Sequence, residues 1–95
     1  MPLFWLSFVD PQKPSGEQFT GVALVEAEGD THEEALKHAI RRAWATGCNP
    51  GGEIQSVLLD GEVLDRMPNE NRVRLARAPR DTLLSKDELA HLDLI

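Results

Sequence analysis

The chain has one cysteine, no long apolar run and fewer basic than acidic residues. A single cysteine cannot form an internal disulfide, which fits a reducing compartment. A membrane-spanning helix needs about 20 consecutive apolar residues, and the first residues lack the basic region and cleavage site of a secretory signal. We therefore expect a cytoplasmic protein without a membrane partner.

Ten lysine and arginine residues stand against 16 aspartate and glutamate residues, giving a net charge of −6. This balance argues against duplex nucleic acid as the main partner, because phosphate binding requires a basic surface. The charge is uneven, since five arginines lie between positions 66 and 80 with Glu70 as the only acid. This segment could capture an acidic ligand or partner, or form a solvated edge strand.

The 95 residues, 41% of them hydrophobic, predict a single α+β domain over 1–95. Residues 3–9 are apolar at almost every position, which predicts a strand buried on both faces. Residues 19–26 and 53–59 predict two more strands, with Asp60-Gly61 as a turn after the latter. Arginines alternate with apolar residues over 72–76, which predicts a fourth strand at an edge.

The main helix is predicted over about 31–46. Thr31 and Glu34 have the spacing of a capping box, and Gly47 is the expected left-handed residue after the helix. Apolar residues form two adjacent i, i+4 stripes, one large (Leu36, Ile40, Trp44) and one small (Ala35, Ala39, Ala43). The alanines would let the helix lie close to a sheet.

Two shorter helical segments follow. A helical turn is predicted over 62–66, and Ser85 with Glu88 forms a second capping box that opens a helix over about 86–92. The fold class is therefore α+β, with a mixed sheet of three or four strands around a β-β-α-β core.

The order of the elements predicts which loops meet. If the helix connects the second and third strands by a right-handed crossover, those strands run parallel. The first strand would pair antiparallel with the second and could lie between the two. The loops over 10–18 and 47–53 would then lie side by side, and a small polar ligand such as a nucleotide could bind between them.

Nine residues of these loops and the neighbouring helix are the ligand-binding candidates: Asp10, Lys13, Gln18, Arg41, Trp44, Asn49, Gly51, Gly52 and Glu53. The glycines do not form a Walker phosphate loop, because the segment follows a helix instead of preceding one. An anion would need side-chain cations, for which Lys13, Arg41 and Arg42 are the candidates.

A purely structural reading explains the same loop. Gly47 ends the helix, Cys48 supplies an apolar cap contact, and Pro50-Gly51 fits the central pair of a type II turn. The sequence leaves the turn and the binding site as alternatives. Trp5 and Trp44 are likewise either core or interface anchors or stacking platforms.

No catalytic constellation is visible. Cys48 has no evident base, and His32 and His38 are six residues apart on a helix, which is not metal spacing. We expect no enzyme activity, no metal and no cofactor.

Several motifs resemble a small family of bacterial and bacteriophage proteins to which no activity is assigned. The pattern is Trp5-Leu6-Ser7-Phe8, Asp10-Pro11, Lys13-Pro14-x-Gly16, Gln18-Phe19-x-Gly21-Val22-Ala23, Glu26-Ala27 and Ala43-Trp44-x-x-Gly47-Cys48-Asn49-Pro50-Gly51-Gly52-Glu53, with a weaker likeness at Leu83-Leu84-Ser85-Lys86-x-Glu88-Leu89. The resemblance covers roughly residues 3–58. It implies a small accessory protein and carries over no catalytic residue.

Two functions therefore stand as expectations. The first is a non-enzymatic module that binds a small polar ligand between the two loops. The alternative is a protein–protein interaction module or an inhibitor of a host protein. A homo-oligomer is also expected, because one helix cannot cover both faces of the sheet, although the C-terminal segment could cover the second face instead.

Overall fold

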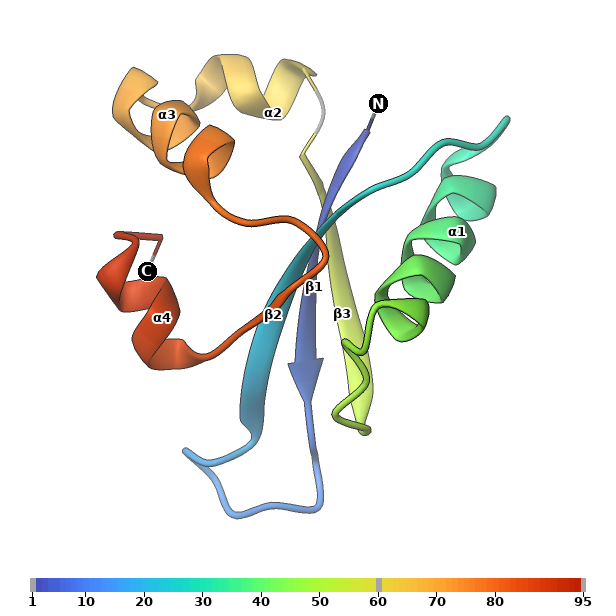
Figure 1. Cartoon of the computed structure of the whole chain (residues 1–95), viewed down its shortest axis with the longest axis vertical. Helices are drawn as coiled ribbons and strands as arrows, with labels where there is room; N and C mark the ends of the chain where they lie inside the picture. Colours follow the sequence, from blue (N-terminus) through green and yellow to red (C-terminus); the bar gives the residue numbers. More distant parts are fainter. Residues whose placement is uncertain (1, 60, 95) are drawn as a thin grey trace.

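The computed structural model describes residues 2–59 and 61–94 of the chain (Figure 1). Its elements, in chain order, are β1 (Leu3–Val9), β2 (Phe19–Glu26), α1 (His32–Ala45), β3 (Glu53–Leu59), α2 (Gly61–Arg66), α3 (Asn69–Arg77), β4 (Leu83–Leu84) and α4 (Lys86–His91). The predicted α+β class is confirmed. Asp60 of the predicted turn lies outside the described residues, and Gly61 begins α2.

The strands form one sheet in the order β3-β1-β2-β4. β1 pairs antiparallel with both β2 and β3, so it lies between them, and β2 and β3 run in the same direction as predicted. β4 pairs antiparallel with β2. Every neighbouring pair is antiparallel, and the prediction of a mixed sheet is wrong in this detail because β1 separates the two strands that share a direction.

The first face of the sheet packs against α1. Alternating β1 side chains (Phe4, Leu6 and Phe8) join Ala23 and Val25 of β2 in this core. The alanine stripe of α1, Ala35, Ala39 and Ala43, is buried against them. Alanine at these positions lets the helix backbone approach the strands, so the predicted role of the stripe is confirmed.

The second face is covered by the C-terminal third of the chain. Leu3, Leu24 and Leu59 pack with Leu75 of α3, while Val22 packs with Leu84 and Leu89. In Figure 1, α2, α3 and α4 lie on the side of the sheet opposite α1. The sequence left two ways to bury this face, an oligomer or the C-terminal segment. The C-terminal segment buries much of it.

The predicted strand over 72–76 is wrong, because these residues lie within α3. The predicted alternation rested on two large apolar residues, of which only Leu75 is buried, while Val73 is 39% exposed. Arginine, leucine and alanine are strong helix formers. Pro68 directly precedes α3, a position where the absence of its own N–H group costs nothing.

The predicted N-cap residues Thr31 and Ser85 both make the expected side-chain hydrogen bonds, and one of the two predicted capping boxes is complete. The Thr31 hydroxyl accepts from the N–H group of Glu34 at 3.1 Å, but the Glu34 carboxylate accepts from Asp30 N–H, so the box is displaced by one residue. At α4 the box of Ser85 and Glu88 is complete.

Candidate functional site

The two predicted loops lie at the same end of the sheet. Val9, the last residue of β1, pairs with Glu53, the first residue of β3. Gly52 packs closely against the backbone at the end of β1. A Cβ atom placed on Gly52 would lie 2.4 Å from the carbonyl oxygen of Val9 and 3.1 Å from the Cα of Asp10. The start of the 10–18 loop is therefore in direct contact with the 47–53 loop.

Hydrogen bonds within the 10–18 loop occupy two of the predicted ligand-binding side chains. Asp10 N–H donates to Gln18 C=O at 2.8 Å and closes the loop. The Asp10 carboxylate accepts from Gln12 N–H at 3.0 Å. The Gln18 side-chain amide donates to Lys13 C=O at 3.1 Å. Asp10 and Gln18 thus shape the loop itself.

The 47–53 loop is a helix end followed by a tight change of direction. Cys48 N–H donates to Ala43 C=O at 2.8 Å and Gly47 N–H to Trp44 C=O at 3.2 Å, which together form a Schellman motif. Cys48 is buried, as predicted for a small apolar thiol. Gly51 has a φ of 87°, as the second central position of a type II turn requires.

The remaining candidates are exposed to solvent. Lys13, Arg41, Asn49 and Glu53 are exposed, and Trp44 is 51% exposed at the end of α1. Within the described part of the chain, no hydrogen bond engages the Asn49 side chain. The structure places the candidate loops together, but it does not enclose their side chains in a pocket.

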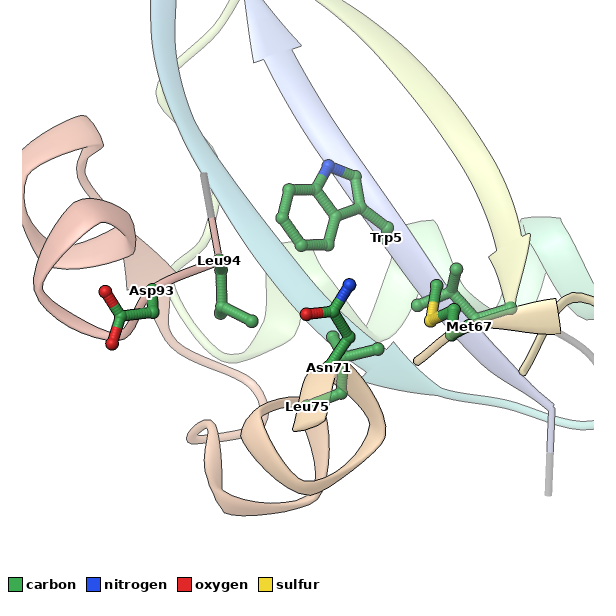
Figure 2. Close-up of a pocket in the computed structure, with 7 residues that line it drawn as sticks. Trp5, Met67, Asn71, Leu75, Asp93 and Leu94 are labelled. Atoms are coloured by element: carbon green, nitrogen blue, oxygen red, sulfur yellow. The ribbon is translucent and has the colours of Figure 1, made fainter. Parts of the chain in front are cut away.

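A small pocket lies on the second face of the sheet, between β1, β3, α3 and the segment after α4 (Figure 2). Its volume is about 120 Å³, and its apolar lining is Trp5, Leu59, Met67, Leu75 and Leu94. Asn71 and Asp93 complete the lining, but Figure 2 shows the Asp93 carboxylate turned away from Trp5. The Trp5 indole N–H donates to Ser7 Oγ at 3.0 Å, so it is not free for a ligand.

A second candidate surface is the outer edge of β3. The strand order places β3 at one edge of the sheet, and within the described residues no strand pairs with its outer side. Its seven residues pair with β1 without a bulge, and Glu53 is its only charged residue. Lysine, proline and bulges are the usual protections of an exposed edge, and β3 has none of them.

One apolar side chain of this edge is largely exposed, and two more are partly exposed. Val57 is 51% exposed on the second face of the sheet. On the α1 face, Ile54 and Leu58 are only partly buried. Sequence reasoning missed this surface because it assigned the edge to residues 72–76. The run of six uncharged residues from Ile54 to Leu59 is the sequence feature that indicates this surface.

Hydrogen bonds on one flank of α1 show which way the opposite flank faces. The ring of His38 shares a hydrogen bond with Glu28 C=O. Arg42 makes two hydrogen bonds of 2.9 Å to the Asp81 carboxylate, and the backbone N–H of Asp81 donates to Leu24 of β2. This flank therefore lies on the β2 side of the sheet. The Asp81 hydrogen bonds, and secondarily its charge, raise the pKa of Arg42, which stays a cation.

The other flank of α1, formed by Leu36, Ile40 and Trp44, consequently faces the β3 side. Leu36 and Ile40 pack on the same core as Ile54 and Leu58, and all four remain partly exposed. Together with Trp44, at the end of the same flank of α1, they form what we call the β3 seam: Leu36, Ile40, Trp44, Ile54 and Leu58. It is an apolar strip that runs beside an unpaired strand edge.

Within the described residues, none of the helices combines the length and apolarity needed to cross a bilayer. Comparison of the chain with protein-family models, with curated proteins and with solved structures gives no match.

Proposed function

We propose that the chain is a non-enzymatic protein–protein interaction module whose contact surface is the β3 edge together with the β3 seam. The observation that carries this proposal is the unprotected edge of β3, seven residues long with one charge. An inhibitor of another protein would use the same surface.

Backbone hydrogen bonds would supply much of the binding. An edge strand presents a row of N–H and C=O groups that an extended partner segment can pair with, and the flanking side chains then give specificity. Val57 on one face of the edge and Trp44 beside the other are the exposed apolar anchors. Tryptophan is enriched at interface centres and among the residues that contribute most to binding, which fits Trp44, whereas Val57 would add apolar area.

Site-specific photo-crosslinking tests this surface. A photoreactive amino acid placed at Val57 should form covalent adducts with protein in the cells that make this chain. The matched control places the same group at Val73, which is also apolar and exposed but lies on α3. Adducts at 57 and not at 73 are expected. The absence of protein adducts at 57, or equal adducts at both positions, would contradict the proposal.

A small polar ligand, such as a nucleotide, bound between the 10–18 and 47–53 loops is the second candidate. It is favoured by the contact between the two loops and by the exposed, unengaged amide of Asn49. A thermal-shift panel of nucleotides tests it. A rise in melting temperature that is lost in Asn49→Ala and Lys13→Ala is expected, whereas no shift with any member of the panel would argue against it.

A further inference from the structure

We infer that the strand which pairs with β3 belongs to a second copy of this chain. The inference rests on the proposed function, namely that the β3 edge is a contact surface, and it names the partner. The two copies would be related by a two-fold axis, since pairing of identical strands in antiparallel orientation generates that symmetry.

The strand length selects one register. Ser56 is the middle residue of Glu53–Leu59, so an axis at Ser56 pairs all seven residues. Ser56 then faces Ser56 of the second copy, Ile54 faces Leu58, Gln55 faces Val57, and Glu53 faces Leu59. No charged residue faces another of the same sign, and the apolar pairs lie on the face of the sheet that α1 covers. Cross-strand pairs of this kind stabilise a sheet.

The β3 seam is self-complementary in the same arrangement. It lies beside the edge that pairs, so the two-fold axis brings the seams of both copies towards each other. Each contributes Leu36, Ile40 and Trp44 from α1 with Ile54 and Leu58 from β3, all of them partly or largely exposed in one copy. Covering these groups with equally apolar groups removes surface from water on both sides.

Charge does not favour a foreign strand over a second copy. The chain carries a net charge of −6, which would attract a basic segment in general. On the β3 edge, however, such a segment would find only the Glu53 carboxylate. An uncharged strand suits this edge better, and β3 itself is such a strand.

Two-fold pairing occupies the β3 edge of both copies, so the assembly through this edge stops at two. β4 contributes only two residues, Leu83 and Leu84, to its pairing with β2. β4 itself is too short to pair with a further strand, and the neighbouring Leu24 carbonyl of β2 already accepts from Asp81 N–H. Joining two four-stranded sheets through β3 therefore closes the assembly instead of forming a fibre.

Sedimentation equilibrium, with the mass measured over a range of concentrations, tests the inference. The wild-type chain is expected to have twice the mass of one chain. Gln55→Lys combined with Val57→Lys puts like charges opposite each other at two places and should raise the dimer dissociation constant at least about tenfold. Gln55→Glu combined with Val57→Lys puts opposite charges at the same two places and should keep the dimer.

The second double variant is specific to this register, because residues 55 and 57 face each other only if the axis passes at Ser56. Val73→Lys serves as the control for an added surface charge, and circular dichroism checks that each variant is folded. A monomeric wild-type chain, or equal dissociation of both double variants, would overturn the inference. Photo-adducts at 57 with another protein, alongside a monomeric wild type, would leave the proposed function standing without the second copy.

Discussion

At the scale of single residues, the two adjacent glycines of the 47–53 loop have similar backbones and different surroundings. Gly51 has a φ of 87° and Gly52 a φ of 79°. A Cβ at Gly51 would meet nothing within 4 Å, whereas one at Gly52 would lie 2.4 Å from the Val9 carbonyl oxygen. The sequence predicts the turn chemistry of Gly51. It does not predict that position 52 has no room for a Cβ atom, because the close approach of Val9 depends on how β1 and β3 are paired.

Gly52→Ala should therefore destabilise the fold more than Gly51→Ala. The left-handed backbone alone costs a residue with a Cβ about 1 to 2 kcal/mol, which is the expected loss for Gly51→Ala. Gly52→Ala adds a collision with backbone atoms, and we expect a total of about 3 kcal/mol or more. Urea unfolding of both variants measures the difference. Equal losses would show that the contact with Val9 is not tight.

At the scale of elements, the helices and strands with end signals were predicted well. α1 and α4 carry capping residues in the sequence, and the structure places both close to their predicted bounds. α3 has no side-chain cap, and its five-residue alternation resembles a strand. The helix propensity of its arginines, leucine and alanine outweighs this alternation, and Leu75 and the C-cap residue Ala78 are buried in the core of the second face.

Ala76→Val tests the helical state of α3. Ala76 is exposed in α3, and valine in an exposed helix position costs about 0.5 kcal/mol relative to alanine. In an edge strand the same change would be neutral or stabilising. The control is Ala90→Val, at an exposed position of α4. Thermal or urea unfolding should show small losses of similar size for both, and a gain for Ala76→Val alone would contradict the helix.

At the scale of the whole molecule, the sheet is a layer between α1 on one side and α2 to α4 on the other (Figure 1). The apolar pattern of β1 predicts that both faces need cover. The pattern does not say what covers the second face, because the core clusters that contain Leu24 with Leu75, and Val22 with Leu89, join residues distant in sequence. The candidate site shows the same limit. Sequence order predicted the meeting of two loops, but not the apolar edge of β3.

Leu89→Ala should destabilise the whole fold. Leu89 is fully buried against Val22 and Leu84, and removing a buried leucine side chain costs about 2 to 5 kcal/mol. Val73→Ala, at a partly exposed position outside these clusters, should cost less than about 1 kcal/mol. Both values follow from urea unfolding monitored by tryptophan fluorescence. A small loss for Leu89→Ala would indicate that α4 is not part of the cooperative unit.

The burial of Cys48 makes the helix end a natural reporter of local opening. Its side chain is 1% exposed, the chain has no other cysteine, and the Thr46 hydroxyl lies 3.8 Å from its sulfur. A thiol reagent can reach this sulfur only while the end of α1 is open. Under conditions where opening and closing are fast, the labelling rate gives the free energy of that opening. The loop that joins α1 to β3 can thus be followed in the native protein without introducing any foreign group.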